Sequence, residues 1–203
     1  MAEFLHQPVN PTGTGVVLTH GAGANCTAPL LVAVANALSA AGAVVLRYDL
    51  PFRQKRPFGP PSPATAAADR AGIRDVVLRM KSLVAGPVLV AGHSYGGRQS
   101  SMLATEEPEL ASGLLLLSYP LHPPGKPAQL RTAHFPTLRT PALFISGTKD
   151  EFGTEAEMKV ALALIPAKTR LISIPRAGHD LAKGKFDLPW RSEILPWFGT
   201  SEP

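Results

Sequence analysis

Residues 88–97 read Val-Leu-Val-Ala-Gly-His-Ser-Tyr-Gly-Gly, an apolar run followed at once by a glycine-rich turn. The run Val88–Ala91 has no polar residue, which is typical of a central strand buried on both faces of a parallel sheet. The turn matches the G-x-S-x-G pattern of a sharp strand-to-helix elbow with Ser94 at its apex. Gly92 and Gly96 fit this pattern, because side chains there would clash in so tight a turn. The stretch therefore predicts a buried strand, an exposed Ser94 hydroxyl and a helix behind it; the alternative is a glycine-rich turn with an ordinary serine.

Outward from this turn, short runs of Val, Ile and Leu alternate with longer amphipathic segments along the whole chain. Such alternation is typical of a parallel sheet covered by helices on both faces. We expect strands over 15–19, 43–48, 88–91, 113–119, 142–146 and 169–174, and helices over 29–41, 63–84, 97–106, 154–165 and 188–198. The fold class is therefore predicted to be α/β, with a mostly parallel twisted sheet of about six to seven strands.

The clearest helical pattern follows Ser62, which can cap a helix that has Pro63 in its first position. Apolar residues recur at three- and four-residue spacing from Ile73 to Val84, and charged residues fill the other positions. One face of this helix should therefore face the core and the other solvent. Asp69 is expected on the solvent side.

Length and composition predict one domain with many well-marked connections. The chain has 203 residues, of which 45% are apolar, so it can fill a core and is not expected to be disordered. We expect residues 1–203 to form a single domain. Proline accounts for 21 residues, about twice the usual share of ~5%. Many of these prolines fall in 51–63 and 120–141, which we expect to be stiffened loops.

Charge and cysteine content argue against several classes of function. The net charge is +5, but the densest basic cluster, Arg53 to Arg56, lacks the interleaved aromatic residues that stack on bases, so we expect no nucleic-acid partner. No apolar run approaches the ~18 residues of a membrane span, so no membrane partner is expected. The single cysteine, Cys26, can form neither an intramolecular disulfide nor a cysteine-based metal cluster. This favours a reducing compartment, and we expect the protein to be cytoplasmic.

Two residues that follow other strands could complete the chemistry of Ser94. A serine hydroxyl needs a base to remove its proton, and His179 lies five residues past the last predicted strand. The base needs an acid that orients it, and Asp150 lies just past the strand 142–146. Glu151 is the substitute for Asp150, and an ordinary turn aspartate is the alternative interpretation. Because the carboxyl ends of parallel strands meet at one edge of a sheet, we expect Ser94, Asp150 and His179 to converge there.

A serine nucleophile also needs two backbone N–H donors for the oxyanion. One should be the amide of Tyr95, the residue after the nucleophile. The other should come from the loop after the first predicted strand, where small residues let the backbone approach a substrate carbonyl. We expect this donor to be Ala22, with Gly23 as second choice. An ordinary turn is the alternative; the loop lacks the Gly-Lys-Ser/Thr of a phosphate-binding Walker motif.

These motifs together resemble those of the α/β-hydrolases, of the compact dienelactone-hydrolase-like kind. The matching residues are His20-Gly-Ala-Gly23, Gly92–Gly97, Ser146-Gly-Thr-Lys-Asp150 and Ala177-Gly-His179. The resemblance implies a parallel sheet of up to eight strands, hydrolysis through an acyl-enzyme, and no metal or organic cofactor. The chain departs from the pattern in three ways: dienelactone hydrolases use cysteine where Ser94 stands, residues 1–14 leave little room for the usual antiparallel pair, and no long lid insertion is present.

We therefore expect a carboxylesterase-like serine hydrolase that acts on an ester-type bond of a small acyl substrate. With minimal or no lid, its site should be shallow and open. The loops 51–63 and 120–141 should form the rim, with His20, Gly23, His122 and Lys126 as pocket residues. Two alternatives stay open: a catalytically silent binding or scaffold module, and a thioesterase or peptidase that uses the same triad.

Overall fold

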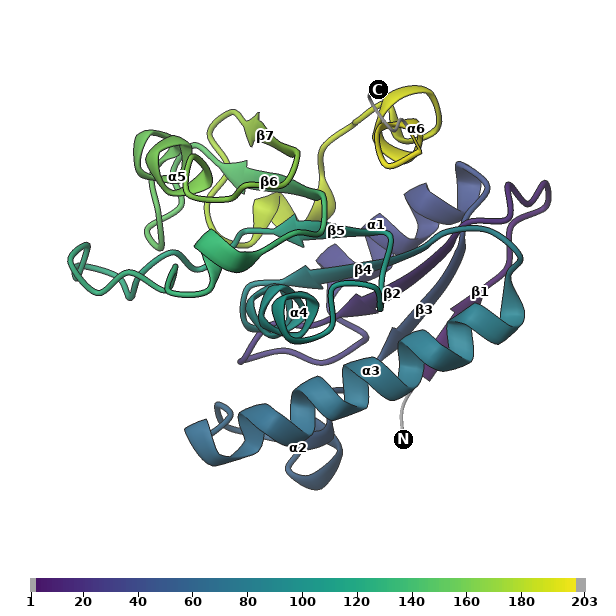
Figure 1. The fold of residues 1–203 in the computed structure, drawn as a ribbon, viewed down its shortest axis with the longest axis horizontal. Coiled ribbons are helices and arrows are strands. Elements are labelled where there is room, and N and C mark those ends of the chain that lie inside the picture. The colour runs from purple at the N-terminus through teal and green to yellow at the C-terminus, as the bar shows by residue number, and fades with distance from the viewer. Residues whose placement is uncertain (1–2, 200–203) are drawn as a thin grey trace.

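The computed structural model describes residues 3–199, and its centre is one twisted seven-stranded sheet (Figure 1). The spatial order of the strands is β1-β3-β2-β4-β5-β6-β7. Every neighbouring pair is parallel except β1 and β3, which are antiparallel. The strands are β1 (Glu3–His6), β2 (Gly15–Thr19), β3 (Val44–Tyr48), β4 (Val88–His93), β5 (Gly113–Leu117), β6 (Ala142–Gly147) and β7 (Thr169–Ile174). The predicted fold class and strand number are confirmed.

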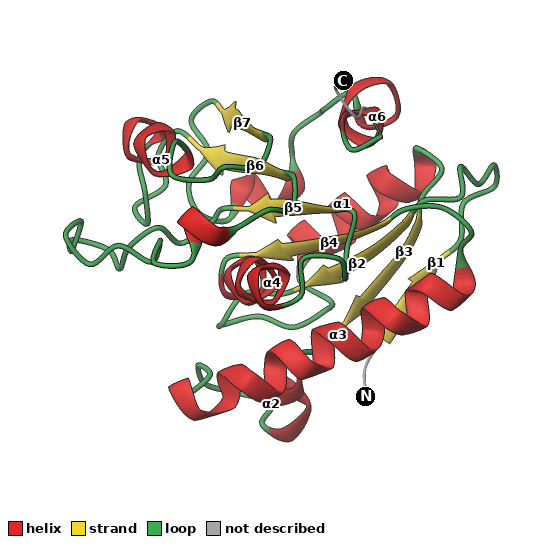
Figure 2. Cartoon of the chain, in the orientation of Figure 1, coloured by secondary structure: helices red, strands yellow, loops and turns green. Residues whose placement is uncertain are grey.

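Helices cover both faces of the sheet, as Figure 2 shows. One face packs against α3, α4 and α5, and the other against α1 and the C-terminal segment. The helices are α1 (Pro29–Ala40), α2 (Pro51–Lys55), α3 (Ala66–Leu83), α4 (Tyr95–Glu106), α5 (Glu155–Leu162) and α6 (Leu195–Trp197). Among the helices of residues 3–199, none combines the length and the apolar character needed to cross a bilayer.

The apolar runs are explained by this two-sided burial. In β2, Val17 packs into the core on the α3 side, whereas Val16 and Leu18 pack into the core on the α1 side. In β4 the same alternation sends Val90 to one core and Leu89 to the other. Successive side chains of a strand point to opposite faces, so a central strand needs apolar residues at every position.

Several elements begin and end close to their predicted bounds because local signals mark them. Strand β7 spans the predicted residues 169–174. Helix α5 begins after Thr154, whose side chain accepts from the Glu157 N–H while the Glu157 carboxylate accepts from the Thr154 N–H. This reciprocal capping box is what the Thr-x-x-Glu spacing predicts.

Other segments differ from the prediction. The stretch 51–63, expected to be a loop throughout, contains α2, which begins at Pro51 and buries Phe52. The expected helix 188–198 is a π-helical turn, Trp190–Ile194, followed by the single turn of α6. Within the described part of the N-terminal segment, residues 3–14, there is one antiparallel edge strand, β1, in place of a pair.

The expectation for Asp69 was wrong, because this side chain is completely buried. Its carboxylate accepts from the Phe52 N–H of α2 at 2.9 Å and from the Tyr95 hydroxyl of α4 at 2.7 Å. The helical pattern marks charged positions as solvent-facing, but the start of α3 is covered by two other helices. Asp69 therefore ties α2 and α4 to α3.

Candidate active site

Ser94 lies at the junction of β4 and α4 in a strained backbone conformation. Its φ is 51° and its ψ is −115°, a combination that non-glycine residues seldom adopt. The Ser94 N–H donates to the Leu117 carbonyl at 2.9 Å, which fixes the turn to β5. A Cβ atom on Gly92 would lie 2.4 Å from the Gly97 nitrogen, and one on Gly96 would lie 2.6 Å from the His20 carbonyl oxygen. The two glycines of the motif are thus sterically required, as the elbow interpretation supposes.

The structure brings Ser94, His179 and Asp150 into one chain of hydrogen bonds. His179 Nε2 lies 2.8 Å from Ser94 Oγ, and His179 Nδ1 lies 2.9 Å from both Asp150 oxygens. A carboxylate only accepts, so the proton of the neutral imidazole sits on Nδ1 and Nε2 is free to accept from the serine hydroxyl. The arrangement can therefore take a proton from Ser94 and hold it beside a negative charge.

Neighbouring groups hold both Asp150 and His179 in place. The Asp150 carboxylate is buried and also accepts from the Phe152 N–H at 2.9 Å. The Phe152 ring stacks on His179, with ring centroids 4.0 Å apart. The other carboxylates nearby do not reach the imidazole: Glu151 is exposed, and Asp180 caps the Ala182 N–H at 3.0 Å.

His93 supports the loop that carries His179. Its Nε2–H donates to the His179 carbonyl oxygen at 2.9 Å, and the two rings lie side by side with centroids 5.2 Å apart. Burial, together with the positive charge that His179 can carry, lowers the pKa of His93 to about 4. His93 therefore stays neutral and keeps its donor in place throughout the neutral pH range.

The buried histidines predict a loss of stability in mild acid. Burial also lowers the pKa of His134 to about 4. Since the pKa of an unfolded histidine is about 6.5, the unfolded chain binds more protons between pH 6.5 and 4, and stability falls as pH drops through this window. We expect urea unfolding to show a free energy lower by about 2 kcal/mol at pH 5.0 than at pH 7.5 from His93 alone.

The less buried His134 should add a smaller loss of unfolding free energy between pH 7.5 and pH 5.0. The replacement His134→Gln should remove this additional loss. Equal unfolding free energies at the two pH values would contradict this expectation.

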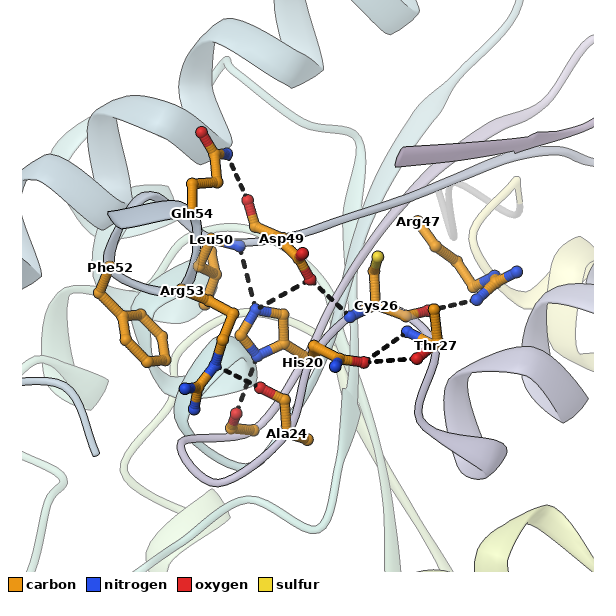
Figure 3. A network of polar contacts seen from close by, with 12 residues as sticks. His20, Ala24, Cys26, Thr27, Arg47, Asp49, Leu50, Phe52, Arg53 and Gln54 are labelled. Atoms are coloured by element: carbon orange, nitrogen blue, oxygen red, sulfur yellow. Dashed lines mark hydrogen bonds and ion pairs between the residues drawn. The ribbon is translucent and has the colours of Figure 1, made fainter. Parts of the chain in front are cut away.

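The loop 21–24 lies beside Ser94 and is held from behind by a polar network (Figure 3). The Gly21 carbonyl accepts from His20 Nδ1 at 2.8 Å and from the Ala24 N–H at 3.1 Å. His20 Nε2 in turn accepts from the Leu50 N–H at 3.0 Å. In a trans peptide the carbonyl and the following N–H point in opposite directions, so the Ala22 N–H points away from these partners. Among residues 3–199, no internal acceptor is found for the N–H groups of Ala22, Gly23 and Tyr95.

Arg53 is the second support of this loop. The side chain is 6% exposed, and it donates to the carbonyls of Ala22 and Ala24 at 2.8 Å each. It also donates to the carbonyls of Arg56 and Gly59, and so ties the proline-rich stretch to the loop. Figure 3 shows Arg53 reaching toward Ala24 from α2. Arg53 is therefore a positioning residue that acts through the backbone of residues 22–24.

Replacing Arg53 with glutamine should lower kcat for a short ester about 10- to 100-fold with little change in KM, because oxyanion donors act in the transition state. Arg56→Gln is the matched control, because the exposed Arg56 side chain donates within its own loop, to the Phe58 carbonyl. Steady-state kinetics beside a thermal melt would measure both. An unchanged kcat in folded Arg53→Gln protein would show that the loop keeps its geometry without this side chain.

The site opens into a cavity of about 480 Å³. Its walls are the loop 21–24, the elbow residues 93–95, and Arg98, Pro120, Arg131, Phe152 and His179. The stretch 120–141 therefore contributes to the rim, as expected, through Pro120 and Arg131. Among the described residues, none from 51–63 lines the cavity. This stretch contributes through Arg53, which holds the loop 21–24.

Of the four predicted pocket residues, only Gly23 lines this cavity. His20 is completely buried behind the loop, where burial lowers its pKa and keeps it neutral. His122 is buried too, and its Nε2 lies 3.4 Å from the Glu157 carboxylate. The backbone N–H of His122 donates to the Phe152 carbonyl. Lys126 is exposed and lies outside the wall. The expectation that these three residues form the rim was therefore wrong: loop membership indicates a surface position but not which way a side chain points.

Sequence reasoning also missed Arg98, Arg131 and Phe152. Arg98 lies four residues after Ser94 on α4, so helical spacing alone places it one turn beyond the nucleophile. Phe152 follows Asp150 by two residues, and Arg131 carries no local signal.

Comparison with known proteins agrees with this architecture. The family described as an alpha/beta hydrolase domain matches residues 12–188. Est1E from Butyrivibrio proteoclasticus, solved with ferulic acid bound, has a TM-score of 0.74 at 18% identity, covering 98% of this chain and 96% of that one. A lidless alpha/beta serine hydrolase from Xanthomonas campestris has a TM-score of 0.69 at 16% identity, covering 97% and 84%.

A dienelactone hydrolase from Anabaena variabilis is similar as well, with a TM-score of 0.67 at 22% identity. The match covers 97% of this chain and 88% of that one. At such identities these likenesses show a shared fold.

Proposed function

We propose, since the chain belongs to the family of alpha/beta hydrolase domains, that it is a serine hydrolase cleaving an ester-type bond of a small acyl substrate. The observation that carries this proposal is the relay from Ser94 Oγ through His179 to Asp150, with contacts of 2.8 and 2.9 Å. The relay opens into a cavity large enough for a small ester.

In the acylation half, His179 Nε2 takes the Ser94 proton while Oγ attacks the substrate carbonyl carbon. The carbonyl oxygen gains negative charge as the tetrahedral intermediate forms. The amides of Tyr95 and Ala22, with Gly23 as second candidate, donate to this oxygen. The protonated His179 is stabilised by the Asp150 carboxylate, and it then gives its proton to the leaving alcohol as the ester bond breaks.

In the deacylation half, a water molecule enters the place of the alcohol. His179 takes a proton from this water, whose oxygen attacks the acyl carbon. The intermediate collapses, the Ser94–acyl bond breaks, and the proton returns to Ser94 Oγ. The enzyme is restored and the free acid is released.

The proposal is tested by assaying 4-nitrophenyl esters of acetate, butyrate and octanoate with the purified protein. Within residues 3–199 no long insertion forms a lid over the cavity, so we expect turnover that is highest for the short acyl chains and declines with length. Preference for octanoate would contradict the small-substrate part of the proposal. Absence of turnover on all three esters by folded protein would favour the silent scaffold alternative.

The same assay separates the other alternative. A thioester or a peptide-like anilide of the same acyl group would be offered beside the ester. Faster cleavage of either would assign the triad to a thioesterase or a peptidase in place of an esterase.

We also propose a cytoplasmic location, because the single cysteine, Cys26, suits a reducing compartment.

A further inference from the structure

Two arginines line the cavity beside the proposed nucleophile. Arg98 comes from α4, one turn after Ser94, and Arg131 comes from the irregular segment between β5 and β6. Both side chains are half-buried. They come from elements far apart in sequence, so the fold itself brings two positive charges to one wall of the site.

Neither arginine forms an ion pair with a carboxylate of the described residues. Four surface arginines do form such pairs: Arg70, Arg74, Arg79 and Arg170 each lie 2.7 to 3.2 Å from a glutamate oxygen. In the cavity, by contrast, Arg98 Nε is buried without a hydrogen-bond partner. Among the described residues, the Arg131 side chain donates only to the Pro120 carbonyl, at a long 3.4 Å. Within residues 3–199, the two cavity arginines therefore have no carboxylate partner, and the side-chain group beside Arg98 is the uncharged Tyr119 hydroxyl.

The surroundings provide no internal anion for the two guanidinium groups. The Tyr119 hydroxyl beside them donates to the Arg131 carbonyl, and burial keeps its proton by raising its pKa. His134, which lies close enough to Arg98 for its charge to act, is neutral at pH 7 because burial and that charge lower its pKa. Burial and the charge of Arg98 also lower the pKa of Arg131. Two like charges held together without a counter-ion are costly, and an anionic ligand removes this cost.

We propose that Arg98 and Arg131 form a binding site for a carboxylate of the substrate, so that the enzyme prefers esters that also carry a free carboxylate. Guanidinium groups match the two oxygens of a carboxylate with paired, charge-assisted hydrogen bonds. The rest of the wall is mainly apolar or glycine backbone, including Phe152 and Pro120. A phosphate group presents more oxygens and more charge than a carboxylate, and inorganic phosphate is therefore the competing anion in the binding test.

This inference rests on the proposed function, but part of its test does not need turnover. The Ser94→Ala protein is titrated with glutarate by calorimetry, and inorganic phosphate is the competing anion. We expect glutarate to bind, and binding to weaken about 10-fold or more when Arg98→Gln or Arg131→Gln is added. Arg139→Gln is the matched control, because Arg139 is exposed and lies outside the cavity wall. Tighter binding of phosphate, or no binding of glutarate, would overturn the carboxylate assignment even if the protein is an active esterase.

The second part of the test measures specificity in the active protein. The mono-4-nitrophenyl ester of glutaric acid is compared with 4-nitrophenyl pentanoate, which has the same chain length and no charge, after subtraction of the uncatalysed rates. We expect a higher kcat/KM for the charged ester. Arg98→Gln and Arg131→Gln should each lower that value about 10- to 100-fold and change the value for the neutral ester less than 3-fold.

Equal losses on both esters would mean that the arginines serve general structure, and a wild-type preference for the neutral ester would overturn the inference. Using two single variants guards against one of them failing to fold. Turnover of neither ester, with glutarate still bound, would count against the esterase proposal alone.

Discussion

Replacing Ser94 with alanine is expected to lower kcat for 4-nitrophenyl acetate by about 10⁴-fold or more, because Ser94 carries the one hydroxyl of the described cavity wall that is hydrogen-bonded to a histidine. Ser94 Oγ is the oxygen that faces His179 Nε2, at 2.8 Å. Alanine leaves the histidine and aspartate in place but offers nothing that can be deprotonated. Steady-state kinetics over a wide range of protein concentration would measure the residual rate.

The matched control for this loss is Ser82→Ala. Ser82 lies on α3, its hydroxyl donates to the Arg79 carbonyl, and neither residue lines the cavity. We expect this variant to keep full activity and both variants to melt within a few degrees of the parent protein. Substantial turnover in folded Ser94→Ala protein would show that the observed hydrolysis has another origin.

Replacing Asp150 with asparagine should lower kcat near neutral pH by about 10⁴-fold, the second largest loss that we expect. In the folded protein one Asp150 oxygen accepts from the Phe152 N–H and both lie 2.9 Å from His179 Nδ1. The asparagine oxygen would keep the Phe152 contact and turn its NH₂ group toward the histidine. His179 would then accept at Nδ1 and carry its proton on Nε2, the wrong tautomer for receiving the Ser94 proton.

Asp180→Asn provides the comparison for this variant. Asp180 is adjacent to His179 in sequence, yet its carboxylate is exposed and caps a short turn. We expect this change to alter kcat less than 3-fold. Similar losses in both variants would indicate a general effect of negative charge on His179 and would argue against a specific role for Asp150.

The residues at the ends of strands were the most predictable part of the site. Ser94, Asp150 and His179 each follow a separate parallel strand, and parallel strands bring such positions to one edge of the sheet. The tight elbow also requires glycine for steric reasons at Gly92 and Gly96, and these two glycines can be recognised in the sequence. Fold and candidate triad could therefore be inferred from short local signals combined with one topological rule.

The walls of the cavity were much less predictable, because they depend on how side chains in irregular segments are oriented. His20 and His122 follow strands as closely as the triad residues do, yet both turn inward and are buried. Arg131 reaches the cavity from a loop with no periodic pattern. Asp69 shows the same limit on a helix, where neighbouring helices bury a charge that the helical pattern alone assigns to solvent.

The most direct test of the central claim is to treat the folded protein with a fluorophosphonate and locate the adduct by peptide mass spectrometry. Such a reagent reacts with a serine whose proton a neighbouring base removes. We predict one adduct per chain, on Ser94, with no adduct in the Ser94→Ala variant. A folded parent protein that stays unmodified, or that is modified at a different residue, would contradict the claim that Ser94 is an activated nucleophile.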